Sequence, residues 1–174
     1  MKYTKKLVLR LIFIALFIYF YQFLDNILTP ITIYFSNLII NLFYNSTIIN
    51  NSIYFQDKVV EFVPACIALT AYSLLFLLIA LTKDISFKKS IKMFLLGSLL
   101  IFIMNIIRIE ILLFLLIKNN YNLFEQVHLL FWNFVSGIYV AFVWIILIKK
   151  YKINSIPIYS DIKYLYQRIN PKRS

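Results

Sequence analysis

The sequence predicts an all-α integral membrane protein with four transmembrane helices, an extracytoplasmic amphipathic helix and a short β-hairpin before the second span. Two observations predict this class. The 174 residues are 62% hydrophobic, whereas soluble domains are roughly half apolar. Long apolar runs also alternate with polar segments, and every second polar segment is rich in lysine and arginine, which is typical of cytoplasmic loops. We therefore interpret residues 1–174 as a single membrane domain.

The apolar runs give the expected spans, which cover residues 7–24, 65–81, 93–117 and 129–148. A transmembrane helix needs about 20 residues, so the first run is just long enough. Lys2, Lys5 and Lys6 precede it, Arg10 lies near its start, and it has no small-residue cleavage site, which favours a retained anchor over a signal peptide. The third run would form a helix about 37 Å long, so it must tilt or protrude.

The basic residues set the expected orientation. They cluster before the first run, between the second and third runs, and in the tail 149–174. Both termini are therefore expected in the cytoplasm of a multi-pass cell-membrane protein, with residues 25–64 outside. The net charge of +11 is explained by this topology and by contact of the tail with anionic lipid, so no nucleic-acid partner is expected.

The outer segment 25–64 has two parts. Asp25-Asn26 is expected to end the first helix, and Thr29-Pro30 to start another over residues 31–44. Asparagines recur at the helical spacing of four on one side of it: Asn37, Asn41 and Asn45. The sequence predicts an amphipathic helix lying in the outer interface, with a short fifth span as the open alternative.

Residues 46–63 change to β-branched and aromatic residues mixed with polar ones, which predicts a hairpin turning at Gln56-Asp57-Lys58. Pro64 suits the first position of a helix, so the second span is expected to start there with Cys66 in its first turn. The positive end of the helix dipole favours a thiolate at this place.

Three reactive groups are expected near the outer face. Cys66 and His128 each begin a helix that runs inward, and Arg108 lies about 14 Å below the outer end of the third span. An arginine in lipid is costly and should face the bundle interior. Asn105 shares the face of Arg108, and Glu125 could orient the ring of His128.

A thiolate–imidazole pair with a nearby fixed cation is a usual arrangement for acyl transfer on sulfur. Cys66 would be the nucleophile, His128 the general acid and base, and Arg108 the oxyanion partner, with Asn105 and Glu125 in support. One cysteine and one histidine fall short of a metal site, and no cofactor is expected.

The sequence resembles the exosortase/archaeosortase family in its motifs. These are Pro64-Ala65-Cys66 opening a span after a hairpin, Asn105-Ile106-Ile107-Arg108-Ile109 within the next span, and His128 opening the last. The resemblance covers residues 46–148. It implies a membrane-embedded cysteine transpeptidase, with catalytic Cys66, Arg108 and His128, that processes secreted or surface proteins bearing a C-terminal sorting signal. It also implies a thioester on Cys66 and a membrane lipid as the expected acceptor.

Two other classes of function stay open at this point. A small transport or channel subunit would use Arg108 and Glu110 to line a polar path, although no expected span is broken at mid-depth by Gly or Pro. A non-catalytic assembly factor would bind other membrane proteins through its basic tail and aromatic helices. Neither alternative needs a reactive Cys66.

Overall fold

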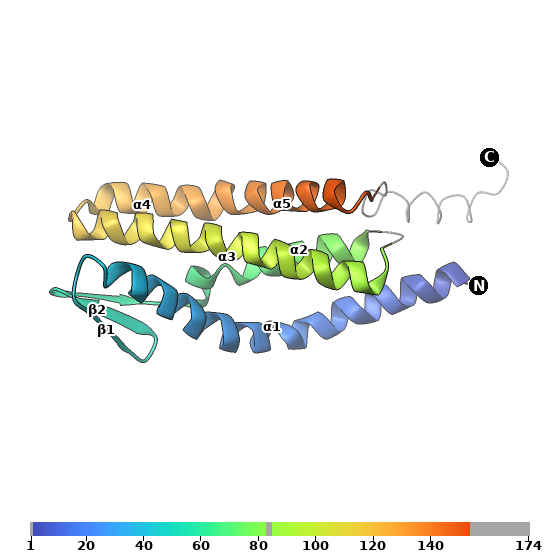
Figure 1. The fold of residues 1–174 in the computed structure, drawn as a ribbon, viewed down its shortest axis with the longest axis horizontal. Coiled ribbons are helices and arrows are strands. Elements are labelled where there is room, and N and C mark those ends of the chain that lie inside the picture. Colours follow the sequence, from blue (N-terminus) through green and yellow to red (C-terminus); the bar gives the residue numbers. More distant parts are fainter. Residues whose placement is uncertain (1, 83–84, 154–174) are drawn as a thin grey trace.

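The computed structural model describes the backbone of residues 2–82 and 85–153 and the side chains of 21–82, 85–132 and 134–153. Four helical rods lie side by side and a small sheet covers one end of them (Figure 1). The first residue of α1 and the last of α5 lie at the opposite end from the sheet (Figure 1). The expected tail is described only as far as residue 153, and the rest lies outside the described residues.

The elements follow one another as rods, strands and turns. The helices are α1 (Lys2–Ile40), α2 (Leu69–Leu81), α3 (Phe87–Ile117), α4 (Tyr121–Leu130) and α5 (Ser136–Lys150). The strands are β1 (Ser46–Ile49), β2 (Ser52–Phe55) and β3 (Lys58–Glu61). A 3-10 turn, η1 (Pro64–Ile67), precedes α2, and a π-helical turn, η2 (Phe131–Val135), joins α4 to α5.

Helix α1 is one helix of 39 residues, so the expected end at Asp25-Asn26 and the separate interfacial helix over 31–44 are wrong. Pro30 lies inside α1 and removes only one helical hydrogen bond, and Figure 1 shows a bend between the two halves of the helix. The Thr29 hydroxyl donates to the Asp25 carboxylate at 2.9 Å, which satisfies a polar pair within the helix. At about 58 Å, α1 is longer than the hydrocarbon core of a membrane.

The outer segment forms three antiparallel strands in the order β1-β2-β3, where the sequence predicted a two-stranded hairpin. Ile49 pairs with Ser52 across the Asn50-Asn51 turn, and Phe55 pairs with Lys58 across a two-residue turn at Gln56-Asp57. Asn50 and Gln56 have positive φ, which asparagine tolerates well and which closes both turns tightly. Residues 46–49, which were expected to belong to the two-stranded hairpin, are therefore a strand of their own.

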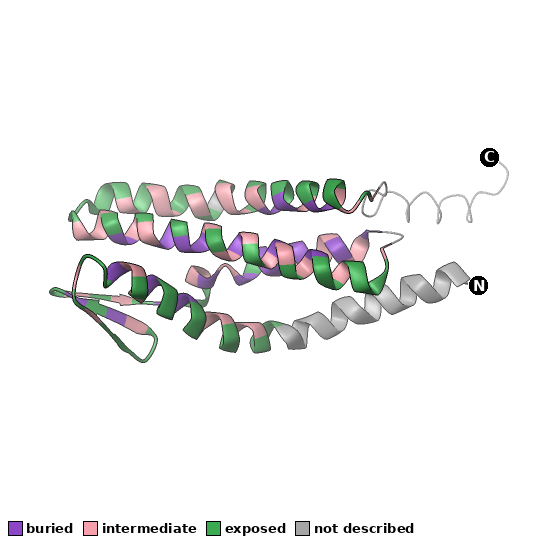
Figure 2. Cartoon of the chain, in the orientation of Figure 1, coloured by how far each residue is buried: buried purple, intermediate pink, exposed green. Residues whose placement is uncertain are grey.

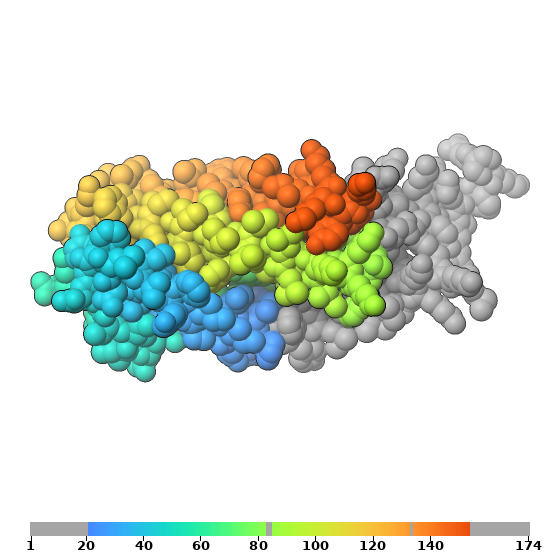
Figure 3. All heavy atoms as spheres, viewed as in Figure 1, coloured from blue at the N-terminus to red at the C-terminus, as the bar shows by residue number. Residues whose placement is uncertain are grey.

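The sheet packs on the bundle through its inner face. Ile53 and Phe55 of β2 are buried against Ile33 and Ile40 of α1 and Ile109 of α3. In the space-filling view the sheet lies directly against the end of α1 and near the yellow part of the chain (Figure 3). This cluster joins the sheet to α1 and α3, and Cys66 packs against it.

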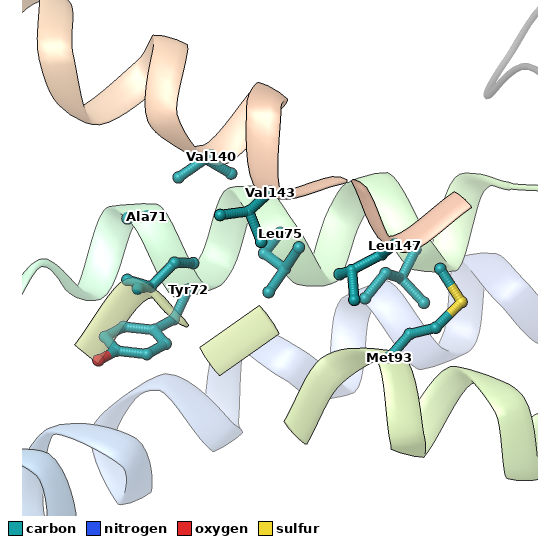
Figure 4. Close-up of a cluster of buried hydrophobic side chains, with 9 residues drawn as sticks. Ala71, Tyr72, Leu75, Met93, Val140, Val143 and Leu147 are labelled. Atoms are coloured by element: carbon teal, nitrogen blue, oxygen red, sulfur yellow. The ribbon is translucent and has the colours of Figure 1, made fainter. Parts of the chain in front are cut away.

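The second cluster of buried side chains holds the four rods together near the other end (Figure 4). Tyr72 and Leu75 of α2 meet Met93 of α3 and Val143 and Leu147 of α5. The outward faces of the rods stay exposed although they are apolar (Figure 2). On α3 these exposed residues recur every four positions: Leu95, Leu99, Ile103, Ile107 and Ile111. Such a stripe, about 24 Å long, suits contact with lipid tails.

Two helical segments of the described residues are long and apolar enough to cross a membrane, Tyr21–Ile40 and Phe87–Ile117. Tyr21–Ile40 overlaps the expected span 7–24 only at residues 21–24 and otherwise lies after it in the chain. The side chains before residue 21 are outside the described residues. Leu69–Leu81 is a shorter apolar helix. The rod of α4, η2 and α5 starts at Tyr121, eight residues before the expected fourth span. The crossing of all four rods stays a prediction.

Gly97 of α3 lets α2 and α5 approach closely. A Cβ there would lie 2.5 Å from Leu75 Cδ2 and 2.9 Å from Leu147 Cδ1, and both leucines are fully buried. We expect Gly97→Val to lower the stability of the bundle by about 1–3 kcal/mol through overpacking. Gly137→Val is the matched control, because no atom lies within 4 Å of its added Cβ. Thermal unfolding in detergent measures both, and equal shifts would contradict the packing described.

Candidate active site

Cys66 lies in a turn between the sheet and α2, not in the first turn of a regular helix as expected. Pro64 opens the 3-10 turn η1, which is closed by the Cys66 N–H donating to the Val63 carbonyl at 2.8 Å. Ala68 then takes a left-handed conformation, with φ 58° and ψ 34°, and α2 begins at Leu69. Left-handed backbone is uncommon outside glycine, so the break at Ala68 is a strained point next to the thiol.

Two side chains of α3 bind the backbone of this turn. Arg108 Nη2 donates to the Cys66 carbonyl at 2.9 Å and to the Ala65 carbonyl at 3.2 Å. Asn105 Nδ2 donates to the Cys66 carbonyl at 2.9 Å. The shared face that the sequence predicted for Asn105 and Arg108 is confirmed, and its target is the main chain of Cys66.

Both α3 residues are buried, with Asn105 4% and Arg108 5% exposed. The Arg108 guanidinium is close enough to the Cys66 side chain to interact electrostatically. Arg108 Nε and Asn105 Oδ1 are buried and have no hydrogen-bond partner in the described structure. The site therefore holds a cation and an amide with bonding capacity left over, which is costly in an apolar bundle unless something else uses it.

A cavity of about 30 Å³ lies beside these groups, between α3 and the η2–α5 segment. Asn105 and Arg108 line it from α3, and Ser136 and Tyr139 line it from α5. Both hydroxyls donate to backbone carbonyls, Ser136 to Phe131 at 2.7 Å and Tyr139 to Leu100 at 3.0 Å. The cavity is large enough for a water molecule, and Cys66 is not among the described residues that line it.

The Cys66 side chain is half-buried and lies against the cluster formed by the sheet, α1 and α3. Its environment is apolar on that side, with Ile109 and Phe62 in the cluster. The thiol and the cavity are therefore separate features. Asn105 and Arg108 of α3 connect them, because they line the cavity and bind the Cys66 carbonyl.

His128 lies inside a continuous helical rod and not at its start. It is seven residues into α4, so it lies about 10 Å below the turn that joins α3 to α4, and Arg108 lies about 14 Å below the same turn. Phe131, three residues later, lines the cavity and shares the His128 face of the helix, and Val135 lines the cavity from the end of η2. The similar depth of Arg108 and His128 agrees with the expectation.

Direct contacts of His128 differ from those expected. No hydrogen bond joins it to Cys66 among the residues whose side chains are described, and α4 packs on α3. Its ring lies against Phe124, with centroids 5.9 Å apart. Glu125 is exposed, and no hydrogen bond between it and His128 is present in the described structure. Asn105 thus has a clear structural role at the site, and the described structure shows no bond from Glu125 to this site.

Three residues of the site were not found from the sequence: Ala68, Ser136 and Tyr139. Ser136 and Tyr139 are polar, lie three apart in an apolar run, and could have been recognised as one inward face of the last span. Ala68 gives no signal, because alanine favours a regular helix. No group of three or more His, Cys, Asp or Glu that could hold a metal ion occurs in the described part of the chain.

A bundle of this kind, with lipid-facing apolar stripes and a buried arginine bound to the backbone of a lone cysteine, defines an integral membrane protein with a polar site inside its helices. The sequence model of the transmembrane exosortases matches residues 1–149. The chain belongs to the transmembrane exosortase family, as its motifs suggested, and is in broad terms a membrane transpeptidase or protease. No curated protein and no solved structure matches the chain.

Proposed function

We propose that this protein cleaves the C-terminal sorting tail of secreted proteins through a thioester on Cys66 and transfers them to a membrane lipid. The observation that supports this most directly is the pair of bonds from Asn105 and Arg108 to the Cys66 carbonyl. They hold the one thiol of the chain next to a fixed cation. An incidental cysteine would have no need of such a backbone clamp.

In the first step the Cys66 thiolate attacks the scissile carbonyl carbon, and the C–N bond breaks to leave a thioester. Arg108 donors not bound to the turn stabilise the oxyanion that forms on the carbonyl oxygen. His128 gives a proton to the leaving amine of the sorting tail. In the second step a nucleophilic group of the lipid attacks the thioester, His128 takes its proton, and the Cys66 thiolate is released.

The absence of a resting hydrogen bond between Cys66 and His128 is compatible with this scheme. Catalytic hydrogen bonds are often long or missing before substrate binds and shorten only in the complex. The leaving amine would lie between the two side chains, so they need to approach the same peptide bond and not each other. The similar depth of Arg108 and His128 below the α3–α4 turn meets that need.

The distribution of charge supports a reaction on the extracytoplasmic side. The sheet and the α3–α4 turn lie at one end of the bundle, and the basic segments at Lys88 and Lys149 lie at the other (Figure 1). Basic ends favour the cytoplasm and contact with anionic lipid. The Cys66 turn is then reached from outside, where secreted proteins with sorting tails arrive.

Labelling of intact cells with a membrane-impermeant maleimide tests this function. Cys66 is the only cysteine, so any label on the protein reports that residue. We expect labelling from outside, complete loss of tail processing in labelled protein, and no label on Cys66→Ala. Protection in intact cells and labelling only after permeabilisation would contradict processing on the outside.

A further inference from the structure

Strand β3 has a free edge. It is the last strand in the order β1-β2-β3, and Phe62, just beyond it, donates its N–H to the Asn51 carbonyl at 2.8 Å. Successive residues of a strand point their backbone groups to opposite sides. Phe62, Val60 and Lys58 therefore point at β2, and the residues between them point away.

The outward row consists of Val59, Glu61 and Val63. Its only bonded group in the described structure is the Val63 carbonyl, which accepts from the Cys66 N–H. The N–H groups of all three residues and the carbonyls of Val59 and Glu61 have no partner among the described residues. Their side chains are also open, with Val59 57% and Val63 45% exposed. The N–H groups of all three residues and the carbonyls of Val59 and Glu61 are thus available for pairing on this side.

The opposite edge of the sheet is not equivalent. Strand β1 packs against α1, and the outward N–H of Ser46 donates to the Asn41 side chain at 3.2 Å. The same alternation makes Ile48 the next outward residue on β1. Only β3 therefore combines an open edge with direct continuation into the Cys66 turn.

The free edge is fixed at both of its ends. Lys58 Nζ donates to the Leu116 carbonyl and to Asn119 Oδ1, so it binds the turn that joins α3 to α4. At the end near Cys66, the Phe62 side chain is only 4% exposed, because it packs in the cluster that joins the sheet to α1 and α3. An edge held in this way keeps a constant position relative to Cys66, three residues after Val63.

We propose that the extended segment of the substrate that precedes its transmembrane helix adds to the outer edge of β3 as a fourth strand. This inference rests on the proposed function and describes how the enzyme would recognise its substrate. The edge from Val59 to Val63 is about 13 Å long, so it would pair with about five residues. Recognition by backbone bonds requires an extended segment without proline at the bonded positions, and exposed Glu61 disfavours an acidic residue beside it.

The direction of pairing follows from the membrane. Strand β3 runs from Lys58, which binds the α3–α4 turn at the outer end of the bundle, toward the Cys66 turn. A sorting signal also runs from outside toward its transmembrane helix, so the two segments are parallel. The scissile bond then follows the paired segment, as Cys66 follows β3.

A second copy of this chain is the other occupant that such an edge could take. Pairing through β3 alone would use a strand of four residues, which gives too small a contact for a stable dimer. A substrate is already held in the same bilayer by its own helix, so a short strand contact suffices by effective concentration. The observations therefore favour the substrate.

The variant Glu61→Pro tests whether the substrate pairs with the outer edge of β3. It removes the outward N–H of Glu61 while leaving the β2–β3 bonds, and proline is tolerated at such positions of edge strands. We expect processing of a tail-bearing reporter by Glu61→Pro to be about tenfold slower than by Glu61→Ala, as loss of a hydrogen bond predicts. Ile48→Pro on the opposite edge should process at the wild-type rate, and thermal unfolding in detergent verifies that each variant is folded.

A photo-crosslinking residue gives an independent result that does not depend on a proline. Placed at position 59 in Cys66→Ala protein, it should crosslink to the uncleaved reporter, and at position 48 it should not. Normal processing by Glu61→Pro, equal crosslinking at both positions, or crosslinking of position 59 to a second copy of the chain would overturn the edge proposal. If Cys66→Ala itself processes the reporter, the proposed function fails instead.

Discussion

Replacing Cys66 by alanine is expected to reduce tail processing to the assay background, a fall of at least about a thousandfold. The thioester needs the sulfur atom, and no other cysteine can substitute for it. The side chain is half-buried and only one heavy atom is removed, so the cost in stability should be about 1 kcal/mol or less. Processing of a reporter in cells, with the amount of folded enzyme measured in parallel, checks this result.

The matched control is Thr70→Ala, which removes a polar group from an exposed position of α2, four residues further on. It should process at close to the wild-type rate. If Cys66→Ala were as active as Thr70→Ala, Cys66 would not be the nucleophile, and a non-catalytic assembly factor would become the better interpretation of the chain.

Arg108→Lys is expected to slow processing by about 10²–10³-fold, the usual effect of losing an oxyanion donor. Arg108 places one amino group on two carbonyls of the Cys66 turn and keeps its remaining donors in a rigid plane. Lysine offers a point charge on a flexible chain and cannot bind the turn and an oxyanion together. Single-turnover formation of the thioester measures the step that should be affected.

Two readouts separate this role from a structural one. A purely structural Arg108 would change thermal stability and the maleimide reactivity of Cys66, because the turn would lose its clamp. We expect the thioester step to fall much more than either property in Arg108→Lys. A rate within threefold of wild type would restrict Arg108 to holding the Ala65 and Cys66 carbonyls.

The helical rods could be predicted because apolar runs of span length have few other solutions, and α3 ends at Ile117 as its sequence indicates. The path from Asp25 to Tyr44 could not. Thr29-Pro30 is a usual helix start, but packing of Ile33 and Ile40 on the sheet outweighs the bond that Pro30 removes from α1. The third strand was missed because Asn50-Asn51 lies in an asparagine-rich stretch with no glycine to mark a turn.

At the site, the depth of Arg108 and its shared face with Asn105 followed from helical spacing alone. Contacts between α3 and the Cys66 turn could not be predicted, because they depend on the break at Ala68, which the sequence does not mark. Helical spacing placed Glu125 within reach of His128, but the contact that the described structure gives to the His128 ring is with Phe124. Spacing gives the candidates on a helix face, and tertiary packing decides among them.

The π-helical turn η2 sets the angular relation between the two halves of the last rod. A π turn accommodates one extra residue, and each residue of a helix corresponds to about 100° of rotation. Without it, the face of α4 that carries His128 would be turned by that amount relative to the face of α5 that packs into the bundle through Val143 and Leu147. The rod therefore consists of two registers joined at Phe131–Val135, one set by the packing of α5 on α2 and α3 and the other by the packing of α4 on α3.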